Sequence, residues 1–136
     1  MKYTPTLSSA ITFGNANNIE EWIHLFLCGE GDNLPFSEGL KLQPRRYHPP
    51  KLFPLNALKR CCGPEEGIKW QIDEKSFNSN VNAIIKRYQK GDWDMPPLIV
   101  RSDANEYELN DGNHRYEALV RLGIKEYWVI FWNPDV

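Results

Sequence analysis

The sequence has few cysteines, no long hydrophobic run and no excess of basic charge. Its three cysteines, Cys28 and the adjacent pair Cys61 and Cys62, fit neither a disulfide framework nor a zinc site, and the pair is expected to pack as thiols. No stretch approaches the ~20 apolar residues that span a bilayer. The first residues lack the basic and apolar regions of a signal peptide. We therefore predict a cytoplasmic protein without a membrane partner.

The charges of the chain are nearly balanced, with 16 Lys and Arg against 18 Asp and Glu and a formal net charge of -2. Binding to a nucleic-acid backbone usually requires a clustered basic excess, so direct nucleic-acid binding is not expected. The nearest approach to a basic patch is the proline-rich segment 41–51, which contains Arg45, Arg46 and His48. We interpret this segment as an exposed connection, and a lid or acceptor pocket is the alternative.

The first 50 residues are predicted to form an arm, a helix and an irregular segment that pack on a core. Residues 1–17 show no strong periodicity and suggest a loose arm or a segment that lies along the surface. Residues 18–29 predict a helix with Asn18 as its cap and one apolar face made of Ile19, Trp22, Ile23, Phe26 and Leu27. The Gly- and Pro-rich segment that follows, about 20 residues long, predicts an irregular connection.

Residues 51–136 are predicted to form the main domain, an α+β fold in which a small mixed sheet packs against helices. Pro54 restricts the short strand near residue 51 to a sheet edge. Helical periodicity over residues 73–91 and 114–123 alternates with strand-like runs at 96–101, 107–110 and 126–132. The last run is apolar at nearly every position, which indicates an interior strand with both faces covered.

The stretch "LNDGNHRYE" lies where a predicted strand meets a predicted helix. A helix N-terminus offers unpaired N–H groups and a positive dipole end, which favour an anion. Gly112 allows close approach of a phosphate, while His114 and Arg115 add donors. Asp111 is a candidate to hold a metal ion or a sugar hydroxyl, and Asn113 can present its amide to either ligand. These residues predict a phosphate-binding turn.

A structural role explains the same stretch without a ligand. In that alternative, Asp111 or Asn113 caps the helix, and His114 and Arg115 are surface residues of its first turn. Cationic side chains in a first turn oppose the helix dipole at a cost of a few tenths of a kcal/mol, unless an anion offsets them. The residues alone leave the two interpretations open.

The run "PPLIVR…YELNDGNHRYEALVRLG" resembles the core of the ParB/sulfiredoxin superfamily, and the likeness covers about residues 51–132. Sulfiredoxins have Gly-Cys-His-Arg at this turn, and ParB proteins, which bind CTP and carry a later helix-turn-helix domain, have Gly-Glu-Arg-Arg. We expect neither the cysteine chemistry nor that later domain here. The ParB-like free serine kinases have Asp-Gly-His-His-Arg, which this chain matches at every position except Asn113.

The resemblance implies a nucleotide-phosphate-binding protein, with ATP or ADP, or alternatively CTP, held at Gly112, Asn113, His114 and Arg115 and with Mg²⁺ at Asp111. It also implies a glutamate base from a loop, for which Glu65 and Glu66 are the candidates, with Asp111 assisting catalysis. The expected function is a serine-kinase-like phosphotransferase acting on a small hydroxyl-bearing substrate, or a nucleotide hydrolase. The alternative is a non-catalytic nucleotide-responsive module or a ParB-like DNA-partitioning accessory module.

Overall fold

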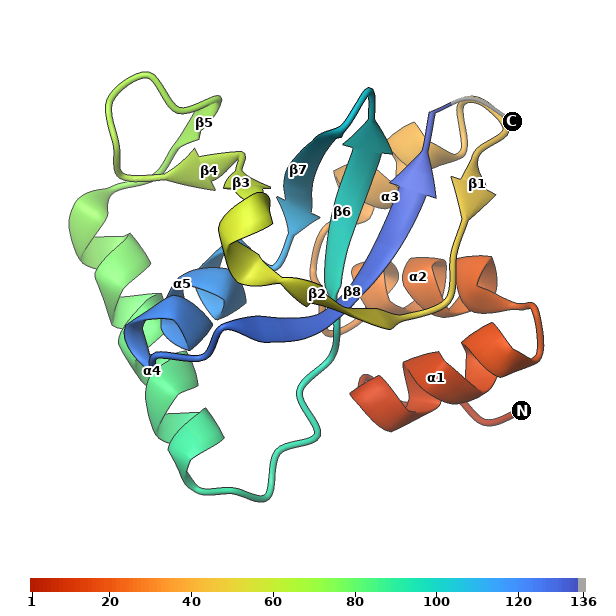
Figure 1. The fold of residues 1–136 in the computed structure, drawn as a ribbon, viewed down its shortest axis with the longest axis horizontal. Coiled ribbons are helices and arrows are strands. Elements are labelled where there is room, and N and C mark those ends of the chain that lie inside the picture. The colour runs from red at the N-terminus through yellow and green to blue at the C-terminus, as the bar shows by residue number, and fades with distance from the viewer. Residues whose placement is uncertain (135–136) are drawn as a thin grey trace.

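The structure is a computed structural model that describes residues 1–134, and Asp135 and Val136 lie outside the described residues. The described residues form five α-helices, one short 3-10 helix and eight strands, and three of the helices come before the first strand (Figure 1). In chain order the elements are α1 (Leu7–Asn15), α2 (Ile19–Cys28), α3 (Leu34–Leu40), β1 (Arg46–Tyr47), β2 (Lys51–Pro54), η1 (Leu55–Ala57), β3 (Lys59–Arg60), β4 (Cys62–Gly63), β5 (Trp70–Gln71), α4 (Glu74–Gln89), β6 (Leu98–Asp103), β7 (Glu106–Asp111), α5 (Asn113–Arg121) and β8 (Glu126–Asn133).

The main sheet is mixed and has the strand order β1-β8-β6-β7-β3, with β2 also pairing with β8. Strand β6 runs parallel to β8 and antiparallel to β7, while β3 runs parallel to β7. Both edges of β8 are paired, with β6 on one side and with β1 and β2 on the other. The predicted α+β class and the predicted interior position of the last strand are therefore confirmed.

Helices cover both faces of this sheet because side chains alternate along its central strands. Ile99 and Ile130 face the N-terminal helices, in a core cluster with Phe13, Trp22 and Phe26. The opposite face carries β6 and β8 side chains that pack against α5, namely Leu98, Val100, Val129 and Phe131 with Leu119. Helix α4 then packs on α5 through Phe77, Val81 and Ala118. This arrangement places the start of α5 beside the end of α2.

The N-terminal region is more ordered than predicted. The expected loose arm contains α1, because Thr6 accepts a hydrogen bond from the Ser9 amide at 3.1 Å and Ala10 and Phe13 are buried against the sheet. The expected irregular connection contains α3, which begins with Pro35 in its first turn. Both helices are short and have few buried apolar residues, so their periodicity in the sequence is weak.

The remaining predicted helices are present. All five residues of the predicted apolar face of α2 are buried, including Trp22. Asn18 precedes this helix as predicted, but its side chain donates to the carboxylate of Glu21 and makes no capping bond to the backbone. Asp73 caps α4 by accepting a hydrogen bond from the Ser76 amide at 3.0 Å. Among the described residues, no helix is long and apolar enough to cross a membrane.

Candidate functional site

The turn between β7 and α5 has the conformation that its glycine predicts. Gly112 precedes the helix with φ 103° and ψ 24°, in the left-handed region. A Cβ at this position would lie 2.7 Å from Leu98 Cδ2 and 2.8 Å from Arg115 Nη2, so a side chain does not fit. The first hydrogen bond of α5 runs from the Tyr116 amide to the Gly112 carbonyl at 2.8 Å. The backbone amides of residues 113–115 therefore have no partner within the helix, and Gly112 has no side chain to cap them.

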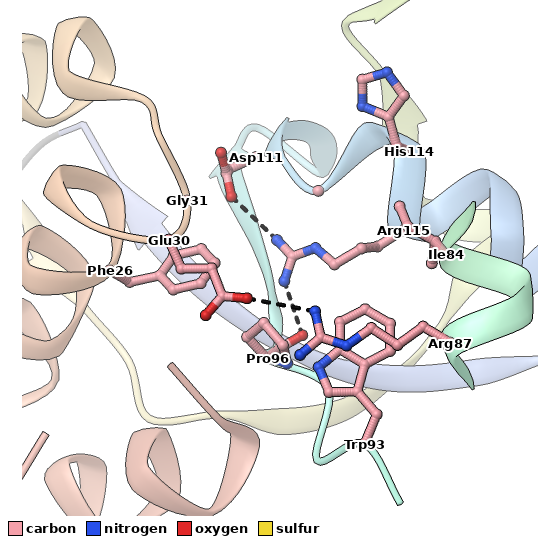
Figure 2. Close-up of a pocket in the computed structure, with 11 residues that line it drawn as sticks. Phe26, Glu30, Gly31, Ile84, Arg87, Trp93, Pro96, Asp111, His114 and Arg115 are labelled. Atoms are coloured by element: carbon pink, nitrogen blue, oxygen red, sulfur yellow. Dashed lines mark hydrogen bonds and ion pairs between the residues drawn. The ribbon is translucent and has the colours of Figure 1, made fainter. Parts of the chain in front are cut away.

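Asp111 and Arg115 form a buried ion pair across this turn (Figure 2). Arg115 Nη2 donates to Asp111 Oδ2 at 3.1 Å, and Arg115 Nη1 donates to the carbonyls of Pro96 and Pro97 at 3.0 and 3.3 Å. Asn33 Nδ2 donates to the second carboxylate oxygen of Asp111 at 3.3 Å. Burial raises the pKa of Asp111 and lowers the pKa of Arg115, while each partner opposes the shift of the other.

These two residues line a pocket of about 290 Å³, which we call the α5 pocket. Its walls come from three segments that are far apart in the sequence: the end of α2, the end of α4 with the loop after it, and the start of α5. The lining residues are Phe26, Glu30, Gly31, Ile84, Arg87, Trp93, Pro96, Asp111, Gly112, His114 and Arg115. Three of the predicted nucleotide-binding residues, Gly112, His114 and Arg115, are thus brought together with Asp111.

A second ion pair lies at the mouth of the α5 pocket. Arg87 Nη1 lies 3.4 Å from Glu30 Oε1, and the Arg87 guanidinium carbon lies 4.0 Å from the centroid of the Trp93 ring (Figure 2). The Glu30 and Arg87 side chains are 45% and 53% exposed, so water screens this pair. None of these three residues was predicted from the sequence, because no distinctive motif surrounds Glu30, Arg87 or Trp93.

His114 lines the α5 pocket but its ring contacts a different layer. The imidazole and the Phe77 ring have centroids 4.9 Å apart. Its Nε2 atom is buried and has no hydrogen-bond partner among the described residues. Burial, and then the cations Arg60 and Arg115, lower the pKa of His114, so the ring is neutral at pH 7. A neutral imidazole can donate to a phosphate but adds no positive charge.

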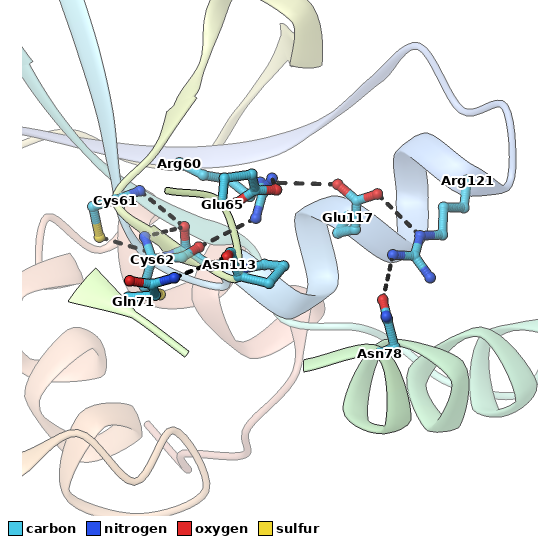
Figure 3. A network of polar contacts seen from close by, with 10 residues as sticks. Arg60, Cys61, Cys62, Glu65, Gln71, Asn78, Asn113, Glu117 and Arg121 are labelled. Carbon is cyan, nitrogen blue, oxygen red and sulfur yellow. Dashed lines mark hydrogen bonds and ion pairs between the residues drawn. The ribbon is translucent and has the colours of Figure 1, made fainter. Parts of the chain in front are cut away.

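Asn113 does not line the α5 pocket; it links α5 to Cys61, which follows β3, and to Cys62 at the start of β4 (Figure 3). Its Oδ1 accepts hydrogen bonds from the amides of Cys61 and Cys62 at 3.0 and 3.3 Å. Its Nδ2 donates to the Leu109 carbonyl at 3.2 Å and contacts Cys61 Sγ at 3.6 Å. With 3% of the residue exposed, this amide faces the interior. The predicted contact between the Asn113 side chain and a ligand does not fit this arrangement.

The two predicted bases lie on the loop between β4 and β5, and neither lines the α5 pocket. Glu65 forms an ion pair with Arg60, which also lies 3.8 Å from Glu117 on α5 (Figure 3). The hydrogen bond from Arg60 lowers the pKa of Glu65. Glu66 is exposed. The carboxylates that do line the pocket are Glu30 and Asp111.

Asp111 was also the predicted metal ligand. Both of its oxygens accept hydrogen bonds, from Asn33 and Arg115. Within residues 1–134, no group of three or more His, Cys, Asp or Glu side chains is placed to hold a metal ion. The residues around Asp111 therefore do not fit a Mg²⁺ site built from protein side chains alone.

No family model matches the chain, and no curated protein matches it. Solved structures with a similar arrangement include a conserved hypothetical protein from Pyrococcus furiosus (18% identity, TM-score 0.48) and a free serine kinase in complex with AMP (19%, 0.47). Another is the C-terminally truncated chromosome-partitioning protein ParB from Caulobacter crescentus complexed with CTP-gamma-S (24%, 0.44). The alignments cover 60%, 60% and 63% of this chain, and 31%, 30% and 45% of those chains.

Proposed function

We propose that the α5 pocket binds the phosphate groups of a nucleotide. The observation that carries this proposal is the left-handed Gly112, which opens the N-terminus of α5 onto a pocket that also holds Arg87 and Arg115. Helix N-terminal amides and guanidinium groups are common partners of phosphate oxygens. The match of residues 111, 112, 114 and 115 to the turn of the ParB-like serine kinases supports the same ligand class.

The two arginines have different roles in this proposal. Arg115 is held by Asp111 and by two carbonyls, so it stays fixed beneath the turn. Arg87 is in an exposed pair with Glu30, which a phosphate can replace at little cost. The indole of Trp93, beside Arg87, supplies an aromatic surface near the phosphates. We expect Arg87 to turn from Glu30 to the ligand.

The size of the α5 pocket limits what it encloses. About 290 Å³ is at the lower end of the usual range for small-molecule sites. We expect the phosphates and sugar to be enclosed and the base to be more exposed, so discrimination among ATP, ADP and CTP should be weak. A Mg²⁺ ion would be held mainly by the phosphates of the nucleotide. Asp111, the metal ligand predicted from the sequence, is already paired with Asn33 and Arg115.

We propose phosphoryl transfer to a small hydroxyl-bearing acceptor, or hydrolysis, as the reaction. In such reactions a carboxylate orients the attacking hydroxyl while cations and amides hold the phosphates. Glu30 is a better candidate than Glu65 or Glu66 for this role, because it lines the α5 pocket and would be released from Arg87 when phosphate binds. Binding thus prepares the base in the same step.

A non-catalytic nucleotide-responsive module is the second candidate. The observation that favours it is that both carboxylates of the α5 pocket, Glu30 and Asp111, are already in ion pairs. A nucleotide that displaced Glu30 from Arg87 would change the contact between the loop after α2 and α4 without any reaction. Turnover measurements separate the two candidates.

Binding is tested by calorimetric titration with ATP, ADP and CTP, each with and without Mg²⁺. We expect Arg87→Gln to weaken the affinity about tenfold, as for the loss of one charge-assisted contact. Arg121→Gln is the matched control, since Arg121 lies in the last turn of α5 and is not among the residues lining the pocket. Undetectable binding of all three nucleotides to the wild-type protein would refute the proposal.

Catalysis is tested by following phosphate release from ATP and transfer to serine and related hydroxyl compounds. If Glu30 is the base, Glu30→Gln abolishes turnover while nucleotide still binds, and Glu65→Gln and Glu66→Gln remain active. Nucleotide binding with no turnover under any of these conditions assigns the protein to the non-catalytic class. Loss of turnover in Glu65→Gln alone would return the base to the loop between β4 and β5.

A further inference from the structure

A second and larger hollow lies on the other side of the hydrogen bond between Asn33 and Asp111. Its volume is about 730 Å³, and Asn33, Phe36, Arg45, Trp70, Arg101 and Trp132 are among its lining residues. We call it the Trp132 pocket. A bulge in β7 separates it from the α5 pocket: Ile99 pairs with Asp111 and Val100 with Leu109, so Asn110 is the extra residue. As a result Asn110 lines the Trp132 pocket, while the next residue lines the α5 pocket.

The Trp132 pocket is positively charged, although the chain as a whole is not. Arg45, Lys69 and Arg101 line it together with a single carboxylate, Glu108, which gives its lining a formal charge of +2. The whole chain has a formal net charge of -2. Lys69 lies 3.6 Å from Glu108, and Arg101 lies 3.2 Å from Asp103, which is outside the lining, so Arg45 is the arginine of the pocket without an ionic partner within residues 1–134. This concentration of cations favours an anionic ligand.

The two arginines come from different elements and meet at one ring. The guanidinium carbons of Arg45 and Arg101 lie 5.2 and 6.0 Å from the centroid of the Trp132 ring. Arg101 is in an exposed pair with Asp103, and an exposed pair of this kind is weak enough for a ligand to replace. The hydrogen bonds of Arg45 within residues 1–134 go to neutral oxygens, such as the carbonyls of Gly39 and Leu40, both at 3.4 Å.

Aromatic side chains form the rest of the binding surface. Trp132 is 7% exposed and its Nε1 donates to Asn110 Oδ1 at 2.9 Å, so its ring is fixed. The centroids of the Phe36 and Trp132 rings lie 6.2 Å apart. Trp70 is different, because it lines the pocket from the two-residue strand β5 while 62% of it is exposed. An exposed indole at the edge of a cationic hollow offers a face on which a flat ring can stack.

We propose that the Trp132 pocket binds a small anionic molecule that carries a flat ring, such as an aryl phosphate or an aromatic carboxylate. The anionic group lies between Arg45 and Arg101, and the ring packs against Trp70. This site is separate from the α5 pocket and does not depend on nucleotide binding there. The proposal gives a binding role to Arg45, on the segment that the sequence suggested was an exposed connection.

The probes for calorimetric titration are phenyl phosphate and 4-hydroxybenzoate. Benzyl alcohol supplies the ring without the charge, and inorganic phosphate and acetate supply the charge without the ring. We expect both ring-bearing anions to bind with dissociation constants below about 1 mM, and the other three to bind at least about tenfold more weakly. Equal binding of phenyl phosphate and inorganic phosphate would show that the ring is not recognised, and would overturn the proposal.

Variants locate the binding. Arg45→Gln and Arg101→Gln should each weaken phenyl phosphate binding about tenfold, and Trp70→Ala should weaken it less. Arg46→Gln is the matched control, because Arg46 is adjacent in sequence, is exposed and is not among the residues lining the pocket. Arg87→Gln should leave phenyl phosphate binding unchanged while weakening ATP binding, so failure here and failure of the proposed function are distinguishable. Unchanged affinity in the Arg45→Gln/Arg101→Gln double variant rejects the proposal.

A single-stranded oligonucleotide shares some of this chemistry, since it combines phosphates with flat bases. An eight-residue oligothymidylate is therefore titrated in parallel. We expect it to bind no more tightly than phenyl phosphate. Binding at least about a hundredfold tighter, lost in Arg45→Gln and steeply weakened by salt, would assign the surface to nucleic acid and overturn the small-molecule proposal.

Discussion

Replacing Asn113 with alanine tests whether its side chain stabilises the packing of α5 against residues 61 and 62. Its side chain accepts hydrogen bonds from the Cys61 and Cys62 amides and donates one to the Leu109 carbonyl. The substitution leaves the buried Cys61 amide unsatisfied, at a cost of about 1–3 kcal/mol, and the half-buried Cys62 amide at a smaller cost. We expect Asn113→Ala to lower the free energy of unfolding by about 2–4 kcal/mol in total.

Urea denaturation followed by tryptophan fluorescence measures this difference, provided that the slope with denaturant is the same in both proteins. Asn80→Ala is the control, because Asn80 is exposed on α4 and a surface change of this kind typically alters stability by about 0.5 kcal/mol or less. A loss below about 0.5 kcal/mol in Asn113→Ala would show that the two amides find other partners. The fastening role assigned to Asn113 would then be refuted.

The same variant has a second and independent readout at Cys61. A hydrogen bond from Cys62, followed by one from Asn113, lowers the pKa of the Cys61 thiol to about 7. Removing the asparagine amide takes away one of these bonds, so the pKa should rise in Asn113→Ala. Site-resolved mass spectrometry of iodoacetamide labelling across a pH series gives this pKa from the shape of the profile. An unmoved midpoint contradicts the proposed contact between Asn113 and the sulfur.

Three further changes test the turn itself. Gly112→Ala should lower the free energy of unfolding by at least about 2 kcal/mol, because φ is 103° and the added Cβ is crowded. Gly91→Ala, at φ 81° in open space, should lower it by about 1 kcal/mol. Equal losses in urea denaturation would show that crowding is unimportant. Arg115→Met should lower the free energy of unfolding by about 3–5 kcal/mol at pH 7, because it leaves the Asp111 carboxylate buried without its cation. The double variant Asp111→Leu/Arg115→Met should recover most of this stability. A loss under about 1 kcal/mol in the single variant would mean that the pair is solvated. The lowered pKa of His114 means that the unfolded chain binds a proton more readily than the folded protein, so stability should fall as the pH drops below 6.5. His114→Gln should reduce this loss of stability at low pH. Identical pH profiles of thermal unfolding in the two proteins would exclude His114 as its source.

The sequence predicts best those helices whose buried residues recur at the helical period. The apolar face of α2 repeats at the helical period and is buried at all five positions, so the periodicity was sufficient. Helices α1 and α3 could not be found in the same way. Helix α1 buries only Ser9, Ala10 and Phe13, and α3 buries only Ser37 and Leu40 and contains both Pro and Gly. Their stability comes from packing against β6 and β8, which follow much later in the chain.

The conformation of the turn was predictable, but the direction of its side chains was not. Gly112 between a strand and a helix indicates a left-handed residue and an open helix N-terminus, and the structure has both. Asn113 was interpreted as a ligand contact because it lies in the motif. Its partners are the amides of residues 61 and 62, about 50 positions earlier, and nothing local in the sequence connects them. Which face of α5 lines the α5 pocket therefore depends on the position of residues 61 and 62.

The position of the acidic groups has the same explanation and bears on mechanism. Glu65 pairs with Arg60, which also lies 3.8 Å from Glu117 on α5, and Glu65 is not among the residues that line the α5 pocket. Glu30 enters the pocket from the loop after α2, a segment that the family resemblance does not cover. Because a base must reach the hydroxyl that attacks the phosphate, position outweighs sequence pattern in choosing between them. If this protein transfers a phosphoryl group, we therefore propose Glu30 as its base, and the Glu30→Gln and Glu65→Gln variants decide between the N-terminal region and the loop that the resemblance implies.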